Sequence, residues 1–327
     1  MNFRDGVGKR IIYVVGKTAP VLDIIIFPFT LLSVVWFRLV RYWGVKNMKA
    51  SRWTFLKFGM FPIVNHYYEP LFDYRKIPRS DDTITHLRFN DEAQLSFLKN
   101  FNFGPELSVI AQDQTAPGEY YYRNGSFGSG DAELYYSIIR KFKPKKILEI
   151  GSGYSTLIAL KARDRNSMED DKSATEIICV EPYEMRYLES KNVRLIREKI
   201  EDLGPQIFNE LNAGDVFFID SSHIIRPGGD VTYLILKILP MVKSGVMIHF
   251  HDIFLPRQYP LAWLRDEFRM WNEQYLLEAL LIGNERFEIV SSLNYLKHKY
   301  HGHLANPFPV LAGDDDREPC SFWIRKK

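Results

Sequence analysis

Cysteine is scarce in this sequence, and internal repeats and segments of low complexity are absent from it. The two cysteines, Cys179 and Cys320, lie far apart and lack the paired spacing of metal ligands, so neither a disulfide framework nor a cysteine zinc site is indicated. Hydrophobic residues make up 46% and charged residues 25% of the chain, which excludes a disordered or collagen-like protein. We therefore expect a folded protein of a reducing compartment.

Acidic residues are nearly absent from the first 60 positions. Residues 1–60 contain ten lysines and arginines but only Asp5 and Asp23, a net charge of +8, so the remainder of a chain with net charge +3 carries −5. The acidic remainder has no stretch of interleaved basic and aromatic residues and is not expected to bind nucleic acid. The basic segment, in contrast, suits an anionic membrane surface.

A charge-free run lies inside this basic segment. Residues 24–37 (IIIFPFTLLSVVWF) are 14 in number, fewer than the roughly 20 needed to cross a bilayer, and Pro28 should interrupt a straight helix. We expect residues 1–60 to be peripheral or monotopic on the cytoplasmic face of the membrane. The alternative is that residues 21–40 form a hydrophobic helical arm packed on the body or on a second subunit. The expected interfacial anchors are Trp36, Arg38, Arg41, Trp43 and Trp53.

Two regions follow this extension. Residues 61–130 are rich in aromatics, Pro, Asn and Gly without a sustained period, and are interpreted as a connecting or cap region. Residues 131–327 alternate strand-like and helix-like segments, beginning with a helix capped by Asp131. Apolar strands separated by helices predict an α/β fold with a doubly wound, seven-stranded, mostly parallel sheet. The expected strands are 146–150, 177–181, 193–197, 215–220, 245–251, 287–293 and 321–325.

The connections between these strands are predicted to be mostly helical. Helices are expected at 156–163, 183–190, 204–212, 230–242 and, as one long helix, 262–282. Residues 163–176 are polar enough to form an exposed loop. A solvated loop is also expected at 296–304, which carries His298, His301 and His303.

The most informative stretch is residues 147–156 (ILEIGSGYST), a strand that ends in a glycine turn and opens a helix. Gly151 and Gly153 allow a sharp turn and close approach of a ligand, although Ser155 stands where a dinucleotide motif has its third glycine. The next strand ends at Glu181, whose carboxylate can accept hydrogen bonds from both hydroxyls of a ribose. A nucleoside-containing cofactor is therefore indicated, and a purely structural turn is the alternative for the glycines.

A fourth strand ending at Asp220 in FIDSSH completes a pattern that resembles the class I S-adenosylmethionine-dependent methyltransferases over residues 125–327. The segments EIGSGYST, DSSH and HDIFLP resemble a bacterial branch of that family, and the last two strands resemble its antiparallel closing pair. The resemblance implies S-adenosylmethionine as cofactor, with residues 126–131 closing over its methionine end. The residues it assigns to the cofactor are Glu149, Gly151, Ser152, Gly153, Glu181, Glu201, Asp202 and Asp220.

Acidic and imidazole side chains follow the fourth and fifth strands. Asp220, His223, His251 and Asp252 should meet near the cofactor, because the carboxyl ends of neighbouring parallel strands share one edge. Methyl transfer to a hydroxyl requires alignment and removal of a proton, so His251 or His223 is expected to act as base, oriented by Asp220 or Asp252. Alternatively, the four side chains bind a divalent metal that polarises the acceptor oxygen, or have structural roles only. Metal-dependent catechol-type methyltransferases, which these carboxylates resemble, follow the second acidic residue with Asn or Asp, whereas Ile253 stands here.

The acceptor is not specified by the sequence. We expect a hydroxyl oxygen of a small molecule, glycan or lipid-linked substrate, methylated by a cytoplasmic enzyme. One alternative is a nicotinamide-dependent Rossmann oxidoreductase, which would share the glycine turn and Glu181. Another is a catalytically inactive, membrane-associated binding or scaffold protein. His249, one position before Phe250 on the fifth strand, is expected to be a hydrogen-bonded core residue.

Overall fold

The computed structural model describes residues 6–77, 85–170, 174–183 and 185–327, with the backbone alone described at 6–17 and 74. The chain forms two compact units, Met1–Arg75 and Lys76–Lys327. The first contains the amino-terminal helices and the second contains the sheet.

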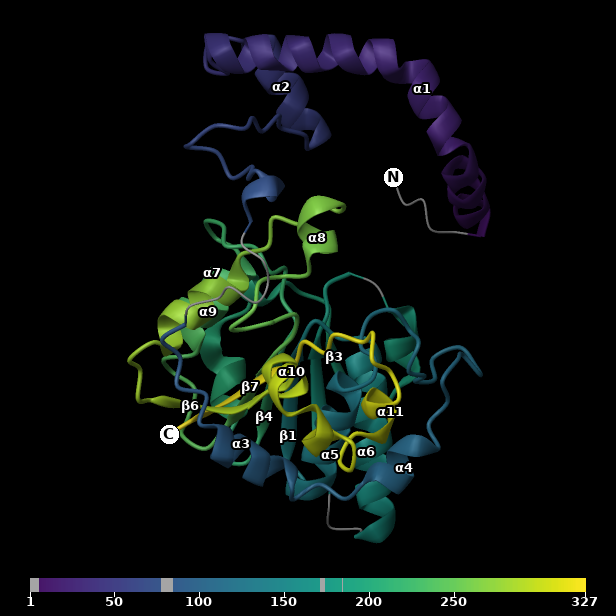
Figure 1. Cartoon of the computed structure of the whole chain (residues 1–327), viewed down its shortest axis with the longest axis vertical. Coiled ribbons are helices and arrows are strands. Elements are labelled where there is room, and N and C mark those ends of the chain that lie inside the picture. The colour runs from purple at the N-terminus through teal and green to yellow at the C-terminus, as the bar shows by residue number, and fades with distance from the viewer. Residues whose placement is uncertain (1–5, 78–84, 171–173, 184) are drawn as a thin grey trace. The chain divides into compact units, whose positions relative to one another are not determined.

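One long apolar helix dominates the first unit. Helix α1 (Gly6–Trp43) is followed by α2 (Lys49–Phe58), whose buried Phe55 contacts Phe37 edge to face. The segment Thr18–Trp43 has 26 residues and a mean hydropathy of 2.0, enough by length and composition to cross a membrane. Where the sequence predicts an interruption at Pro28, the helix continues through Pro20 and Pro28 and its axis changes direction instead (Figure 1). Internal prolines bend a helix because they remove a hydrogen bond and crowd the preceding turn.

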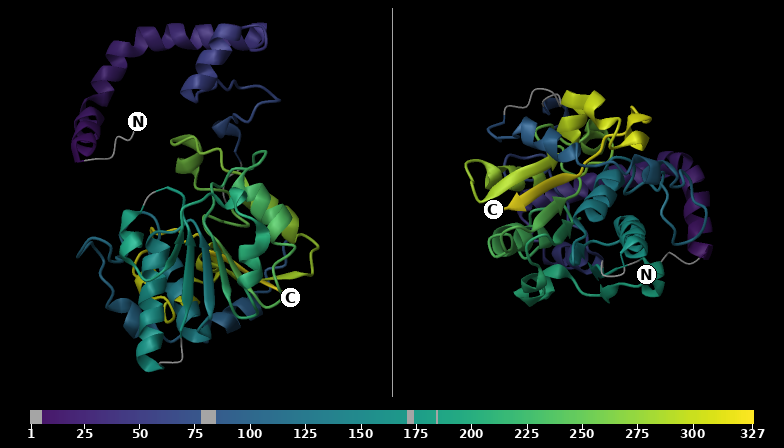
Figure 2. Two further views of the ribbon diagram at one scale, coloured as in Figure 1. Left: turned by 180° about the vertical axis from the view of Figure 1, so that it is seen from behind. Right: turned by 90° about the horizontal axis from the view of Figure 1, so that it is seen from below.

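One seven-stranded sheet, in the order β3-β2-β1-β4-β5-β7-β6, forms the centre of the second unit (Figures 1 and 2). Neighbouring strands from β3 to β5 are parallel, and β7 runs antiparallel to both β5 and β6. The predicted doubly wound α/β fold is therefore confirmed. The strands are β1 (Lys146–Ile150), β2 (Glu176–Val180), β3 (Arg194–Ile196), β4 (Val216–Ile219), β5 (Met247–Phe250), β6 (Phe287–Ser292) and β7 (Phe322–Lys326).

Two hydrophobic cores lie on the two faces of this sheet, as expected when successive strand residues point in opposite directions. On β1, Ile147 belongs to the first core and Leu148 to the second. Helices cover both faces (Figure 2). The first core includes residues of α5 (Asp131–Phe142), α6 (Tyr154–Glu169), α10 (Leu293–Leu304) and α11 (Pro309–Ala312). The second includes residues of α7 (Asp230–Tyr233), the π-helical turn η5 (Leu234–Ile238) and α9 (Glu273–Leu281).

Much of the predicted connecting region packs on the sheet. Helices α3 (Asp91–Leu98) and α4 (Gly104–Ser108) contribute Leu98 and Leu107 to the first core. The boundary between the two units falls at Arg75–Lys76, within the region predicted at 61–130.

Several helices differ in extent from the prediction. Helix α6 continues to Glu169 through much of the predicted loop at 163–176, because the buried Asn166 donates to the carbonyl of Ile139 at 2.9 Å and holds a polar residue on the inner helix face. Residues 171–173 of that loop lie outside the described residues. The expected helices at 183–190 and 204–212 are 3-10 turns, η2 (Arg186–Ser190) and η4 (Pro205–Glu210).

The prediction of a loop at 296–304 is wrong: this segment is the end of α10, where Leu296 and Leu304 are buried in the first core. The single helix predicted at 262–282 is instead two helices, α8 (Leu261–Arg265) and α9. The backbone N–H groups of Asn272 and Glu273 donate to the carbonyl of His223, at 3.0 and 3.2 Å. Helix α9 therefore begins beside the loop that follows β4.

Candidate active site

A cavity of about 650 Å³ lies at the carboxyl ends of β1, β2, β4 and β5. The volume is within the range of small-molecule sites, and this edge of a doubly wound sheet is where ligands ordinarily bind. The structure therefore brings together residues that the sequence places at four separate strand ends. Predicted residues that line the cavity are Gly151, Ser152, Gly153, Glu181, Asp220, His251 and Asp252.

Gly151 forms the tightest part of the turn after β1. Its φ is +78°, and a Cβ atom built on it would lie 2.2 Å from the carbonyl oxygen of Asp220. The backbones interlock here, because Asp220 N–H donates to the Ile150 carbonyl at 2.8 Å and Gly151 N–H donates to the Val180 carbonyl at 3.0 Å. Only glycine fits this position without displacing a neighbouring strand end. Gly153, by contrast, has an extended φ of −178°, so its missing side chain only leaves room at the cavity wall.

Glu181 borders the cavity directly after β2. Its Oε2 accepts a hydrogen bond from Ser152 N–H at 3.2 Å and its Oε1 accepts one from Tyr183 N–H at 2.9 Å. These bonds fix the carboxylate beside the glycine turn while the side chain remains partly exposed to the cavity. The hydroxyl of Ser152 is buried and has no hydrogen-bond partner among the described residues.

Three predicted cofactor residues lie elsewhere. Glu149 is fully buried, and its carboxylate accepts hydrogen bonds from the Tyr135 hydroxyl at 3.0 Å and the Thr156 hydroxyl at 2.5 Å. Desolvation by burial raises the pKa of Glu149 to about 7, against the effect of these two bonds. Glu201 and Asp202 lie on η3 (Ile200–Asp202), outside the cavity lining. The structure thus brings neither Glu149 nor this acidic pair to the cavity.

Two histidines and two aspartates cluster on the side of the cavity formed by β4 and β5. His223 Nε2 lies 3.3 Å from Asp220 Oδ1 and 3.5 Å from Asp252 Oδ2. His251 Nδ1 lies 3.5 Å from Asp252 Oδ1 and 3.7 Å from Asp220 Oδ1. We call these four residues the acidic–imidazole cluster. Both His223 and Asp252 adopt left-handed backbone conformations, with φ of +61° and +56°, which are uncommon for residues other than glycine.

A buried carboxylate that the sequence analysis missed supports this cluster from behind. Glu273, at the start of α9, is 1% exposed. Its Oε2 lies 2.9 Å from His223 Nδ1, and its Oε1 accepts a hydrogen bond from the Ser221 hydroxyl at 2.8 Å. Trp271 lies against the His223 ring, with centroids 4.3 Å apart. The only signal for Glu273 in the sequence is its place in the segment WNEQYLL.

The charges of the cluster reinforce one another. Burial disfavours protonation of His251, but the charges of Asp252 and Asp220 raise its pKa to about 9. Burial also opposes protonation of His223, yet Asp220 and Glu273 raise its pKa well above the ordinary value. For Asp220, desolvation is outweighed by the charge of His251 and by contacts with both imidazoles, which hold its pKa well below the ordinary value. The cluster therefore favours an ionised Asp220 beside protonated imidazoles of His223 and His251.

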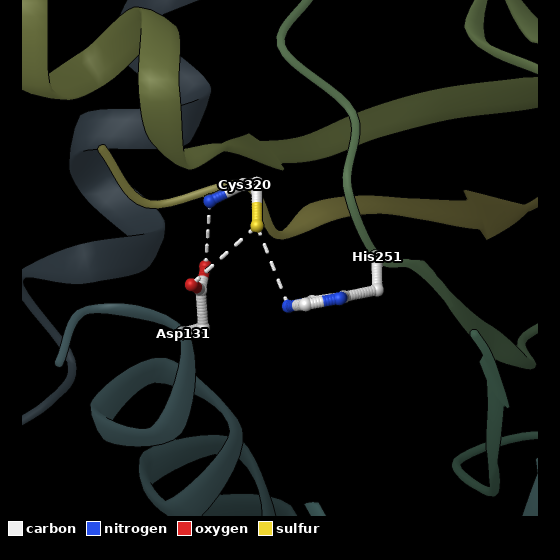
Figure 3. A group of neighbouring side chains, drawn as sticks. All are labelled: Asp131, His251 and Cys320. Atoms are coloured by element: carbon white, nitrogen blue, oxygen red, sulfur yellow. Dashed lines mark hydrogen bonds between the residues drawn. The ribbon is translucent and has the colours of Figure 1, made fainter. Parts of the chain in front are cut away.

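A second group, drawn in Figure 3, joins His251 to the start of α5 and to the segment before β7. Asp131 at the start of α5 and Cys320 before β7 both lie beside His251, and Cys320 Sγ is 3.4 Å from His251 Nε2. The Asp131 carboxylate accepts hydrogen bonds from Cys320 N–H at 2.8 Å, Ser321 N–H at 2.7 Å and Arg317 Nη2 at 2.8 Å. This arrangement corrects the expectation that Asp131 caps α5, because the cap is Gly130, whose N–H donates to Glu133 at 2.9 Å.

Of the segment expected to close over the methionine end, Ser126 and Phe127 line the cavity, whereas Asp131 is fully buried. His249 is also fully buried, as expected of a core residue, with Nε2 3.0 Å from the Ser321 hydroxyl. His298 lies on α10, and its Nε2 is 2.8 Å from Glu318 Oε2. Of the three histidines of 296–304, none belongs to a metal-binding group within the described residues.

The comparison with protein families matches one part of the chain. Residues 148–253 match the model of a family described as a methyltransferase domain. The match runs from β1 to the residue after Asp252 and so includes the glycine turn, Glu181 and the acidic–imidazole cluster. It supports a methyltransferase domain in this part of the chain.

More distant similarities extend over larger parts of the chain. An uncharacterized protein of Archaeoglobus fulgidus is 29% identical over 164 residues, which cover 45% of this chain and 72% of the other. Among solved structures, an O-methyltransferase from Bacillus cereus in complex with SAH has 12% identity and a TM-score of 0.34, and covers 72% of this chain and 91% of that chain. A putative methyltransferase from Thermobifida fusca has the same identity and TM-score and covers 72% and 88%. Scores this low establish neither a shared fold nor a shared activity.

Proposed function

We propose that this protein transfers a methyl group from S-adenosylmethionine to a hydroxyl oxygen of a small molecule, glycan or lipid-linked acceptor. The observation that carries the proposal is one cavity with the glycine turn and Glu181 on one side and the acidic–imidazole cluster on the other. The methyltransferase-domain match over 148–253 supports the same assignment. The antiparallel β7 favours it over a nicotinamide-dependent oxidoreductase, since the closing strand pair resembles that of the methyltransferases.

The cavity has features that suit a nucleoside cofactor. Gly151 and Gly153 leave backbone exposed at the wall, and Glu181 presents a carboxylate that can accept hydrogen bonds from ribose hydroxyls. These three positions are the proposed binding residues for the nucleoside part.

When bound, S-adenosylmethionine supplies an electrophilic methyl group, and the chain must align the acceptor and remove its proton. Of the two imidazoles of the cluster, His251 lines the cavity and His223 does not. We assign proton uptake to His251 in its neutral form, which a pKa of about 9 makes the minor form at pH 7, with Asp220 and Asp252 orienting the ring. The guanidinium of Arg269 lies 4.2 Å from the Trp263 ring centre and 4.6 Å from that of Trp271, and Arg269 and Trp263 both line the cavity.

Calorimetric titration of the purified full chain with S-adenosylhomocysteine tests the proposal. We expect saturable binding, and about 10- to 100-fold weaker binding for Glu181→Gln, because a charge-assisted bond to ribose is worth about 1.5–3 kcal/mol. The control Glu189→Gln changes an exposed carboxylate paired with Arg197 and should bind like the wild type. Absence of binding, or tighter binding of a nicotinamide dinucleotide, would reject the assignment.

We further propose that the first unit attaches the enzyme to the cytoplasmic face of an anionic membrane. Apolar side chains of α1 are exposed within the described residues, among them Ile24 at 76%, Phe29 at 70% and Leu32 at 68%. Basic residues follow the apolar segment on α2, where Lys57 also lies 4.6 Å from the Trp53 ring. Apolar area beside basic and tryptophan side chains suits the headgroup layer of such a membrane.

Flotation of the full chain with liposomes containing anionic lipid tests this attachment. Leu32→Asp places a charge in the apolar segment, at a cost of up to about 3 kcal/mol, so we expect at least about tenfold less protein in the floating fraction. Val109→Asp is the matched control, since Val109 is 83% exposed but belongs to the second unit. Equal flotation of both variants, or none of the wild type, would count against the membrane proposal.

A further inference from the structure

The separations within the acidic–imidazole cluster do not suit hydrogen bonds. The four N···O distances between its imidazoles and carboxylates range from 3.3 to 3.7 Å, whereas good hydrogen bonds of this type are about 2.7–3.2 Å long. Two ligand atoms that share one ion at about 2.1 Å, with an angle of about 90–110°, lie roughly 3.0–3.4 Å apart. The contacts of His223 Nε2, at 3.3 and 3.5 Å, are close to this spacing.

Three of these residues form a compact ligand set. One ligand atom each of Asp220, His223 and Asp252 lies within 4.8 Å of the others. Glu273 lies 2.9 Å from His223 Nδ1, so Nδ1–H can donate to its carboxylate. Binding of an ion would then displace the proton from Nε2 and leave its lone pair facing the ion between the two aspartates. Histidines that bind metals are ordinarily oriented by such a carboxylate.

One further observation points to a ligand at this position. His251 is 5% exposed, and its Nδ1 faces Asp220 and Asp252 without a hydrogen-bond partner among the described residues. A buried polar atom without a partner is costly unless a ligand satisfies it.

We propose that Asp220, His223 and Asp252 bind a divalent transition-metal ion at the acceptor side of the cavity, with Glu273 as the residue that orients His223. An imidazole among carboxylates favours Mn²⁺, Fe²⁺ or Zn²⁺ over Mg²⁺ and Ca²⁺, which prefer oxygen ligands alone. The catechol-type enzymes have Asn or Asp directly after the second acidic residue, whereas this chain has Ile253, which cannot bind an ion. His223 would supply the third ligand instead. The role of the ion toward an acceptor hydroxyl rests on the proposed function, whereas the binding of the ion does not. Such an ion would act there as a Lewis acid.

The group in Figure 3 is the competing position for an ion, and its contacts disfavour it. The Asp131 carboxylate already accepts three hydrogen bonds, one of them from the positively charged Arg317, which would repel a cation. Cys320 Sγ donates to Asp252 Oδ1 at 3.1 Å. Cys320 therefore holds one oxygen of Asp252 while the other faces His223.

The test is a titration of the chelator-treated full chain with Mn²⁺, followed by loss of the free-ion electron paramagnetic resonance signal. We expect one site per chain and about 10- to 100-fold weaker binding for His223→Gln and Glu273→Gln. His298→Gln changes an exposed histidine on α10 and should bind as the wild type does. Cys320→Ser keeps a hydroxyl donor for Asp252 and should retain saturable binding. Circular dichroism establishes that each variant is folded, and Glu273→Gln remains informative if His223→Gln is not.

Two results would overturn the inference: no saturable Mn²⁺ binding by the wild type, or binding that survives His223→Gln and Glu273→Gln but is lost in Cys320→Ser. Calorimetry with S-adenosylhomocysteine on the same preparations separates this inference from the proposed function. His223 does not line the cavity, so His223→Gln should keep nucleoside affinity within about twofold of the wild type. Nucleoside binding without metal binding would reject the ion and leave the methyltransferase proposal standing.

Discussion

Gly151→Ala is expected to lower the free energy of unfolding by about 3–5 kcal/mol and to weaken S-adenosylhomocysteine binding by more than about 100-fold. A side chain at φ +78° costs roughly 1–2 kcal/mol because the left-handed region crowds Cβ against the backbone. The larger part comes from the 2.2 Å approach to the Asp220 carbonyl, which must move and disturb the bond from Asp220 N–H to Ile150. Because β1 and β4 adjoin the cavity, the displacement changes both stability and binding.

Gly214→Ala is the matched control for the backbone part of this effect. Gly214 has φ +87°, but a Cβ built there meets nothing within 4 Å. This variant should lose only the roughly 1–2 kcal/mol of the left-handed conformation and bind the nucleoside normally. Urea denaturation followed by circular dichroism measures both variants. Equal losses for the two would show that the contact with Asp220 has no energetic consequence.

The residues that meet in the cavity were predictable because each stands at the end of a strand. In a parallel sheet with β1 between β2 and β4, the positions after Ile150, Val180 and Ile219 must lie at one edge, whatever the connecting helices do. Gly151, Glu181 and Asp220 follow from this rule. Glu149 does not, because the strand alternation that directs Leu148 and Ile150 to the second core directs Glu149 to the opposite face.

Glu273 was not predictable for a different reason. Its position beside His223 depends on the break between α8 and α9, and the sequence of 262–282 has the apolar spacing of a single helix. The break is stabilised by hydrogen bonds from the N–H groups of Asn272 and Glu273 to the carbonyl of His223. Because His223 is about 50 positions away in the sequence, local helix propensity cannot predict this break. The helix around Pro28 is a similar case: the proline predicts an interruption, yet α1 continues through it.

Asp131→Ala should lower the free energy of unfolding by about 3–5 kcal/mol, although Asp131 does not line the cavity. The residue is fully buried at the start of α5 and accepts hydrogen bonds from three donors in residues 317–321, directly before β7. Its removal leaves two backbone N–H groups and the Arg317 guanidinium without their acceptor, which is the costly way to break a buried ion pair. Asp131 thereby joins segments almost 190 positions apart in the chain.

One further variant separates the charge from the hydrogen bonds, and a second serves as a control. Asp131→Asn keeps an oxygen for the N–H groups of Cys320 and Ser321 but loses the charge that faces Arg317, so we expect a smaller loss of about 1–3 kcal/mol. Asp113→Ala removes an exposed carboxylate 3.4 Å from Arg123 and should change stability by less than about 0.5 kcal/mol. Chemical denaturation monitored by tryptophan fluorescence compares them. An Asp131→Ala variant as stable as Asp113→Ala would mean that β7 is held by its strand pairing alone, since β5 and β6 flank it on both sides.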